Sequence, residues 1–451
     1  MDFSKREFPK GFKFWLLVWG LGLIGQLCWN IENQWFNTFV YAKIAKNSTI
    51  VTLMVITSAL VTTFSTFFFG TFSDRSGTRR KFVSIGYIIW GIFTIIFGLT
   101  EFTGKILNQN PGKYTWLAAL LVILADDIMS FFGSLGNDCG YNAWINDMTT
   151  DNNRGQIGAS LATQPVIATI VGTIVGGFLI GTNDNYQRLF WTMGIFVISI
   201  GFLSLFVMKD SPYLKPYKDG SFWNQFSKVF TLKNFPTSKE LILVCVTTAL
   251  FFIPFNVYFV HMGNWLIYYM GFTPDKMGLI EGIGLILAMF LTVPAAILIN
   301  KKRTPIVSYV AIFMDLIGVF TISFLVKKNS INTVNVFSLN NLTLFIGVFF
   351  AGSGYILITQ SMTMWLKQLY PENSRGQFEG IRIVFFTLLP MIIGTIIGNI
   401  VVKNGAGTTI NSYGIKENIP TSSIFTWSGI LLFPSLIPLF FAAKSYYKRI
   451  K

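Results

Sequence analysis

The sequence predicts an all-α membrane protein with twelve transmembrane helices, arranged as two parallel repeats of six. Three observations predict this fold: a very apolar composition, twelve long apolar stretches and an internal duplication. The chain is 52% hydrophobic and 12% charged, whereas a soluble domain carries about 25% charged residues. Each crossing of a bilayer needs about 20 apolar residues. Such stretches lie near residues 13–40, 48–72, 82–102, 115–145, 156–181, 189–208, 242–270, 277–300, 306–326, 342–366, 380–402 and 423–443.

A short motif occurs once in each half of the 451-residue chain. Arg154-Gly155-Gln156 is followed by Gly172-Thr173-Ile174-Val175-Gly176, and Arg375-Gly376-Gln377 is followed by Gly394-Thr395-Ile396-Ile397-Gly398. Because six predicted spans separate the two copies, both motifs face the same side of the membrane, and the halves are parallel repeats. The predicted domains are a bundle over 1–208, a linker over 209–241 and a second bundle over 242–451.

The net charge of +15 is distributed unevenly between the two sides of the membrane. With the N-terminus inside, the cytoplasmic loops hold 24 Lys and Arg residues and the outer loops hold 10. An excess of basic residues marks the cytoplasmic side. We therefore expect both termini in the cytoplasm, in a multi-pass protein of the cell membrane. The lipid bilayer explains the basic charge, so no nucleic-acid partner is expected.

The predicted linker contains six Lys residues interleaved with Phe and Trp. This pattern is typical of an amphipathic segment that lies at the membrane surface and joins two bundles. The linker is too short for a soluble domain. No G-x-x-x-x-G-K sequence is present, which argues against transport driven by ATP within this chain.

The sequence also argues against metal and enzyme chemistry. The chain holds one His and three Cys, and Cys28, Cys139 and Cys245 all fall inside apolar stretches. Neither a multi-histidine zinc site nor a disulfide framework is expected. No H-E-x-x-H or G-x-S-x-G pattern occurs. We expect no enzyme activity and no cofactor.

One polar loop carries a recognisable signature. Gly70-Thr71-Phe72-Ser73-Asp74-Arg75-Ser76-Gly77-Thr78-Arg79-Arg80-Lys81 lies between the second and third predicted spans. Gly70, Asp74, Arg75, Gly77 and Arg79 resemble the G-x-x-x-D-R-x-G-R-[KR] motif of the major facilitator superfamily. The corresponding loop of the second half, 301–305, keeps the charge without the Gly and Asp. The resemblance implies a major facilitator fold over nearly the whole chain.

In that superfamily the loop helps to hold the two halves together on the cytoplasmic side. Gly70 and Gly77 would allow close packing and a tight turn. The alternative is that these charges only set the topology. The cytoplasmic gate that the resemblance implies comprises Gly70, Asp74, Arg75, Gly77, Arg79, Arg154, Arg375, Glu379 and Arg382, with the last three as partners of Asp74.

Span 1 carries a polar stripe. Gln26, Asn30, Asn33 and Asn37 are spaced by four, three and four residues, which places them on one face of a regular helix. Trp29 flanks that face. Glu32 points about a third of a turn away.

Span 4 carries a second stripe, of Asp127, Ser130, Ser134, Asp138 and Tyr141. Asp127 lies near the middle of the membrane, and Asp126 is its neighbour, turned about 100° away. Polar side chains are costly in lipid, so each stripe indicates either a cavity or ties between helices. The superfamily resemblance implies a central cavity lined by spans 1, 4, 7 and 10.

These considerations give two sets of candidate residues. The candidate coupling-ion residues are Asp126, Asp127 and Glu32. The candidate substrate-binding residues are Gln26, Trp29, Asn30, Asn33, Asn37, Ser134, Asp138, Tyr141, Asn256 and Gln360. Asp315 is expected to have a structural partner, and Glu281 to lie at the outer membrane interface.

The leading functional expectation is a secondary active transporter that acts as a monomer. A carboxylate near the midplane would bind H⁺ or Na⁺, and a small polar solute would bind beside it. The face of amides and Trp on span 1, with acids on spans 1 and 4, is similar to that of the glycoside–pentoside–hexuronide cation symporters and the sucrose-type carriers. This resemblance implies a sugar or glycoside as solute. The alternatives are a proton-coupled antiporter that exports amphiphilic drugs or metabolites and, from another class, a membrane enzyme or receptor.

Overall fold

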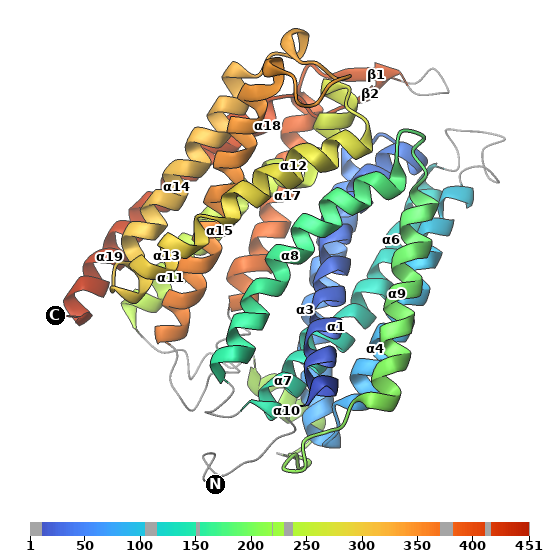
Figure 1. The fold of residues 1–451 in the computed structure, drawn as a ribbon, viewed down its shortest axis with the longest axis vertical. Helices are drawn as coiled ribbons and strands as arrows, with labels where there is room; N and C mark the ends of the chain where they lie inside the picture. Colours follow the sequence, from blue (N-terminus) through green and yellow to red (C-terminus); the bar gives the residue numbers. More distant parts are fainter. Residues whose placement is uncertain are drawn as a thin grey trace. The chain divides into compact units, whose positions relative to one another are not determined.

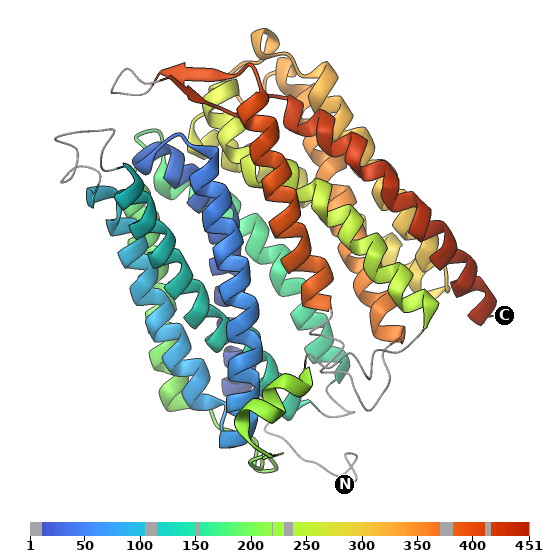
Figure 2. The same cartoon turned by 180° about the vertical axis from the view of Figure 1, so that it is seen from behind.

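The protein folds almost entirely into membrane-spanning helices (Figures 1 and 2). The computed structural model describes residues 11–103, 115–149, 154–218, 220–229, 238–369, 382–410 and 416–450. Twelve helical segments within these ranges are long and apolar enough to cross a membrane. The twelve predicted spans are thereby confirmed, with ends that differ by a few residues. We number them 1 to 12 along the chain.

The first six spans are built from seven helices longer than a single turn. Span 1 combines α1 with the short α2, and span 4 combines α6 with α7. The bounds are α1 Phe12–Ile31, α2 Asn37–Phe39, α3 Ser48–Ser76, α4 Arg80–Leu99, α6 Thr115–Gly133, α7 Asn142–Met148, α8 Arg154–Ile180 and α9 Tyr186–Val207. Part of the predicted linker forms α10, Phe222–Val229.

The last six spans follow the same plan with more interruptions. Span 8 combines α12 and α13, and span 12 combines α18 and α19. The bounds are α11 Lys239–Asn264, α12 Pro274–Met289, α13 Thr292–Asn300, α14 Thr304–Phe320, α15 Leu342–Leu369, α17 Leu389–Asn404, α18 Ser423–Leu432 and α19 Leu436–Ile450. The antiparallel strands β1 (Thr408–Ile410) and β2 (Lys416–Asn418) pair with Thr408 opposite Asn418.

Several spans contain wider π-helical turns. Span 1 has them at Glu32–Phe36 and Val40–Ile44, and span 4 at Ser134–Tyr141. Others occupy Trp265–Met270, Thr321–Leu325 and Val384–Leu388. Each such turn holds an extra residue, so the side chains beyond it are rotated by about 100° from where a regular helix would place them.

The helices group into two compact units. One unit comprises Met1–Asn33, Thr57–Gly172 and Asn185–Thr231, and the other comprises Gln34–Ile56, Thr173–Asp184 and Leu232–Lys451. In the first unit α4 packs against α6 and α9, which lies beside it in Figure 1. In the second unit α14 packs against α15, and α11 against α17. The division into two six-span sequence halves stays a prediction.

The duplicated glycines have equivalent neighbours. A Cβ on Gly172 would lie 2.3 Å from Asn30 Oδ1 of span 1, and a Cβ on Gly394 would lie 2.4 Å from the Ile253 carbonyl oxygen of span 7. Asn33 and Asn256, three residues further along each span, donate to the carbonyl four residues back in their own helices. Spans 5 and 11 therefore contact spans 1 and 7 in the same way, which supports the duplication seen in the sequence.

The superfamily motif is more helical than the sequence suggests. Helix α3 continues to Ser76, so Asp74 and Arg75 lie in its last turn rather than in a loop. Only Gly77, Thr78 and Arg79 link α3 to α4. Gly77 has φ +63°, and a Cβ there would lie 2.7 Å from Pro216. This position needs glycine both for its left-handed backbone and for the close approach.

Candidate functional site

A carboxylate on span 1 is held by two hydroxyls from neighbouring spans. Glu32 lies at the start of the first π turn, and its Oε1 accepts hydrogen bonds from Ser58 Oγ at 2.7 Å and Ser130 Oγ at 3.0 Å. The two hydroxyls also lie 2.9 Å from each other. The other oxygen, Oε2, is enclosed and has no hydrogen-bond partner among the described residues. Spans 1, 2 and 4 of the first unit thus meet at one acid.

Two further acids lie on α6 near this group. Asp126 is 1% exposed, and its Oδ1 has no partner in the described part of the chain. Both Asp126 and Asp127 lie close enough to Glu32 for their negative charges to repel it. Asp127 is half-buried and lines a shallow hollow of about 350 Å³ with the apolar side chains of Val61, Ile128, Phe131 and Phe132. The three predicted coupling acids therefore form one cluster, in which Asp126 is the more buried aspartate.

The polar stripe of span 1 divides at the π turn. Gln26, Trp29, Asn30 and Asn33 are all half-buried and belong to the first unit with Glu32. The ring of Trp29 lies 4.9 Å from the ring of Trp90. Asn33 Nδ2 donates to the Trp29 carbonyl at 2.7 Å.

Asn37 lies beyond the π turn and belongs to the second unit, where its carbonyl accepts from Asn264 Nδ2 at 3.1 Å. The one-face arrangement predicted for Gln26 to Asn37 assumed a regular helix, which the wider turn interrupts.

The stripe of span 4 is divided in a similar way. Ser130 lies on α6 and reaches Glu32, whereas Ser134 and Asp138 lie in the π-helical segment that follows. Ser134 is fully buried, and Asp138 is half-buried. Tyr141 donates to the Val18 carbonyl at 2.6 Å, which ties span 4 to the N-terminal half of span 1. Its hydroxyl is therefore engaged in helix packing.

The predicted substrate residues of the second half lie in the second unit, within their own helix packing. Asn256 is buried and donates from Nδ2 to the Phe252 carbonyl at 2.8 Å. Gln360 is half-buried and donates to the Thr292 carbonyl at 3.2 Å. Asp315 is fully buried and accepts from Tyr258 at 3.1 Å, a structural partner as expected.

A buried polar chain in the second unit was missed by sequence reasoning. Glu281 was expected at the membrane interface, but it is only 7% exposed, and its carboxylate accepts a hydrogen bond from Gln34 Nε2. Gln34 Oε1 in turn accepts from Thr173 Oγ1 at 2.7 Å. The chain joins spans 1, 5 and 8. Its members lie up to 247 residues apart, so no local pattern could have revealed it.

Arg79 organises the predicted cytoplasmic gate within the first unit. Its guanidinium bonds Asp74 at 2.7 Å, Asp147 at 2.9 Å and Ser73 Oγ at 2.6 Å. Burial lowers the pKa of Arg79, but the Asp147 and Asp74 carboxylates outweigh burial and raise it above its ordinary value. Asp210 accepts from the backbone N–H groups of Arg79 and Arg80, both at 2.8 Å, and so caps the N-terminus of α4.

The start of the linker docks on the same motif. The Tyr217 N–H donates to the Asp74 carbonyl at 2.8 Å. Arg75 Nη1 donates to the Gly220 carbonyl at 3.0 Å and to Gln225 Oε1 at 2.9 Å. The aromatic residues of α10 then contact α3: the rings of Phe222 and Phe68 are 5.2 Å apart. The described part of the linker is therefore fixed to the first unit.

Other predicted gate residues have different places. Gly70 was expected to allow close packing, but a Cβ at this position would meet no described atom within 4 Å, so no close contact depends on the glycine. Arg154 begins α8, but its side chain is not among the described ones. Arg375 and Glu379 lie outside the described residues. Arg382 lies over the ring of Phe386, 5.5 Å from its centre, in the second unit.

The acid cluster is suited to holding a small cation. One Glu32 carboxylate oxygen and the Ser58 and Ser130 hydroxyl oxygens converge, and Oε2 is left to carry a proton. Within the described ranges, no group of three or more His, Cys, Asp and Glu side chains is placed to hold a metal ion.

The chain was compared with known proteins at the levels of family, sequence and structure. A profile of the Major Facilitator Superfamily matches residues 18–395. A search of curated proteins found no match.

Among solved structures, the fold is similar to those of many proteins, and three transporters serve as examples. A bacterial homologue of the human lysosomal transporter Spinster, in an inward-facing and unoccupied conformation, has a TM-score of 0.72 and 14% identity, over 98% of this chain and 99% of that one. The D-xylose–proton symporter has a TM-score of 0.69 and 15% identity, over 95% of this chain and 97% of that one. A point mutant of the nucleoside transporter NupG has a TM-score of 0.68 and 11% identity, over 95% of this chain and 99% of that one. Since the matched profile covers most of the sequence, the chain belongs to the Major Facilitator Superfamily.

Proposed function

We propose that this transporter couples the inward movement of H⁺ to the uptake of a small polar solute. The observation that carries the proposal is the Glu32 carboxylate, which two serine hydroxyls hold and whose second oxygen has no partner among the described residues. A buried carboxylate is costly in a membrane and usually functional. Protonation removes that cost, so proton binding and release can favour different conformations of the transporter.

Geometry favours H⁺ over Na⁺ as the coupling ion. Only three oxygens converge at the Glu32 site in the described part of the chain. Hard cations such as Ca²⁺ take six to eight oxygen ligands, whereas one carboxylate oxygen is enough for a proton. Asp126 lies close enough to Glu32 for their two negative charges to repel each other, and a proton on either acid relieves that repulsion.

For the solute we propose a sugar or glycoside. Gln26, Asn30 and Asn33 place amide groups on the same helix as Glu32, and Trp29 supplies an aromatic ring. Amides bind sugar hydroxyls, and an aromatic ring packs on the apolar face of a sugar. A fold similar to that of a D-xylose–proton symporter is in keeping with this proposal. The branch we propose is that of the glycoside–pentoside–hexuronide symporters and sucrose-type carriers.

The transporter acts as a monomer in the cell membrane with both termini in the cytoplasm, and it needs no cofactor beyond the coupling ion. Its two sequence halves, 1–208 and 242–451, alternate access to the solute by rocking.

A second candidate is proton-coupled export of an amphiphilic compound. It is favoured by an aromatic cluster in the second unit, where the rings of Phe255 and Tyr355 stack at 4.8 Å and those of Phe252 and Phe386 lie 5.2 Å apart. Such a surface would suit a greasy cargo. The direction of proton movement on addition of solute separates the two functions.

The test measures proton movement in de-energised cells that express the transporter. Addition of a monosaccharide or disaccharide from a panel should make the medium more alkaline for the transported sugar, because H⁺ enters with it. Glu32→Gln should abolish this signal and uphill accumulation while sugar counterflow persists. Glu101→Gln is a matched control, because Glu101 is also buried and bonds a neutral side chain, Gln187, in the same unit.

Three results would decide against the proposal. A full proton signal in Glu32→Gln would mean that Glu32 is not the coupling residue and that the proton binds elsewhere. Entry of Na⁺ with the sugar, without alkalinisation of the medium, would mean that Na⁺ and not H⁺ is the coupling ion. Drug sensitivity on deletion, with no sugar response, would favour export.

A further inference from the structure

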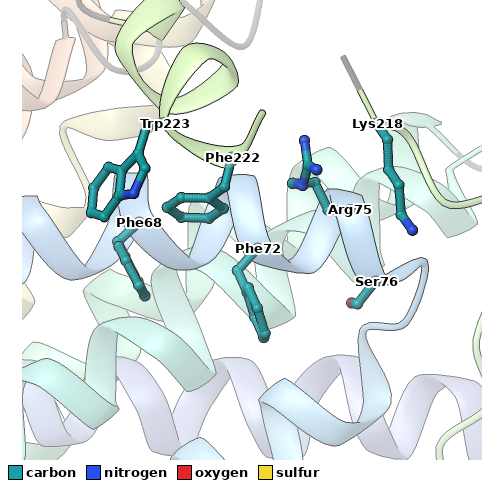
Figure 3. Close-up of a pocket in the computed structure, with 7 residues that line it drawn as sticks. All are labelled: Phe68, Phe72, Arg75, Ser76, Lys218, Phe222 and Trp223. Atoms are coloured by element: carbon teal, nitrogen blue, oxygen red, sulfur yellow. The ribbon is translucent and has the colours of Figure 1, made fainter. Parts of the chain in front are cut away.

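A hollow of about 450 Å³ lies where α10 crosses the end of α3 (Figure 3). All the elements that form it belong to the first unit. One wall comes from α3, and the other comes from the linker and α10. The hollow is lined by Phe68, Phe72, Arg75, Ser76, Lys218, Phe222 and Trp223.

One end of the hollow is apolar and open to its surroundings. Trp223 is 64% exposed and Phe72 is 48% exposed. Phe222 lies between them in Figure 3, with its ring 5.2 Å from that of Phe68. Exposed aromatic rings at the end of a membrane span are typical of the level at which lipid headgroups meet acyl chains.

The other end of the hollow is cationic. Arg75 donates only to neutral acceptors, the Gly220 carbonyl and Gln225 Oε1, among the interactions of the described residues. Neither Arg75 nor Lys218 pairs with a carboxylate in the described ranges. The nearby carboxylate of Asp74 is paired with Arg79. Two positive charges are therefore available to an anion, whereas the Ser76 hydroxyl already donates to the Ser73 carbonyl at 2.9 Å.

We propose that this hollow binds an anionic phospholipid of the cytoplasmic leaflet. Its phosphate lies between Arg75 and Lys218, and the upper part of an acyl chain lies along Phe68, Phe72 and Trp223. A soluble phosphate would leave the aromatic rings in water, and a zwitterionic lipid would leave the positive charge uncompensated. Basic residues just cytoplasmic of a span attract anionic headgroups for the same reason.

The proposed lipid would add to the hydrogen bonds and ring contacts that already join two parts of the chain. Phe68 and Arg75 lie on span 2, whereas Lys218 and Phe222 lie on the linker. A lipid seated between them would hold the linker against the motif that contains Asp74 and Arg79. Anionic lipid would thereby stabilise the docked linker.

The test uses Trp223 as a reporter in the full-length protein, reconstituted in nanodiscs. Brominated phosphatidylglycerol or brominated phosphatidylcholine is added in rising mole fraction to a neutral lipid. The chain holds 12 Trp residues, so the signal from Trp223 is the difference between the wild type and Trp223→Phe. We expect phosphatidylglycerol to quench this signal at a lower mole fraction than phosphatidylcholine.

Two linker variants test the charge. Lys218→Gln should raise the mole fraction of phosphatidylglycerol at half-quenching about fivefold. Lys215→Gln is the matched control, because Lys215 is exposed three residues away and does not line the hollow; it should change little.

Three outcomes would overturn the proposal. Equal quenching by the two lipids would show a surface without headgroup preference. Equal effects of Lys215→Gln and Lys218→Gln would show a general charge effect. Loss of phosphatidylglycerol quenching in millimolar inorganic phosphate would show a small-anion site instead of a lipid site.

Discussion

Ser58 Oγ donates a 2.7 Å hydrogen bond to Glu32 Oε1, and this bond links span 2 to the acid of span 1. Hydrogen bonds to charged groups contribute about 1.5–3 kcal/mol. The hydroxyl of Ser130 bonds the same oxygen at 3.0 Å, so the carboxylate is held from two sides. Its orientation therefore depends on residues of three different spans.

Ser58→Ala should slow coupled uptake about tenfold, because a bond of this kind is worth at least about 1.5 kcal/mol. Ser58→Thr keeps the hydroxyl and should retain most of the rate. Initial rates of proton-driven solute uptake measure both effects. An unchanged rate in Ser58→Ala would mean that Ser130 alone is sufficient to orient the acid.

Asp126→Asn should reduce coupling more than Asp127→Asn. Asp126 is 1% exposed, whereas Asp127 is half-buried and lines an open hollow; Oδ1 of each lacks a hydrogen-bond partner among the described residues. A buried charge costs about 2.5–3.5 kcal/mol on insertion scales. The neutral amide at position 126 should therefore leave thermal stability equal or higher while it lowers the number of protons moved per solute. Proton-to-solute flux ratios measure the loss of coupling in each variant, and melting curves measure its stability. A larger loss of coupling in Asp127→Asn than in Asp126→Asn would contradict this prediction.

The sequence predicts the spans well because their signal is local. Apolar stretches of about 20 residues report burial in lipid directly, and all twelve are found. The polar stripes are predicted less well, because the helical period was assumed to be regular. The π turn at Glu32–Phe36 inserts an extra residue, which separates Asn37 from Asn33. The spacing of the residues does not indicate that turn.

Contacts between distant residues are the second limit of sequence reasoning. Glu281 reads as an interfacial residue because it lies near the end of its span, but Gln34 of span 1 provides its buried partner. In the same way, Asp74 was expected to pair with Arg375, Glu379 and Arg382. Its described partner is Arg79, and Arg375 and Glu379 lie outside the described residues. Such pairings follow from the packing of the helices, which a single sequence does not specify.

Arg79→Gln should destabilise the first unit. Removing one partner of a fully buried ion pair costs about 3–5 kcal/mol, but Asp74 is 47% exposed and water screens its charge, so we expect about 1–3 kcal/mol. Thermal unfolding in detergent measures the loss. Arg80→Gln is the control, because exposed Arg80 uses its side chain only on the Leu205 carbonyl among the described interactions. Equal melting temperatures for the two variants would contradict a special role for Arg79.

Glu281→Ala should open the second unit near the C-terminal end of span 1 and the N-terminal end of span 2. The substitution removes the carboxylate oxygen that accepts the hydrogen bond from Gln34, whereas Glu281→Gln keeps an oxygen that can accept it. A cysteine in place of Val51, which is fully buried in this unit, can report access to a membrane-impermeant maleimide. The native cysteines are all buried, so background labelling should be low. We expect faster labelling in Glu281→Ala than in Glu281→Gln, and equal rates would mean that the hydrogen bond does not restrict access.

Substitutions at the two duplicated glycines should have different consequences, although the glycines occupy equivalent positions. A methyl group at Gly172 would meet Asn30 Oδ1, the end of a side chain that can rotate away. A methyl group at Gly394 would meet the Ile253 carbonyl at 2.4 Å, and a backbone group inside a helix cannot move alone. Gly394→Ala should therefore lower the yield of folded protein, because spans 7 and 11 must separate.

By contrast, Gly172→Ala should fold and raise the KM for the solute, since it displaces Asn30 beside the proposed site. Size-exclusion profiles and uptake kinetics distinguish the two effects. A normal KM in well-folded Gly172→Ala would remove Asn30 from the solute site and leave it a packing role.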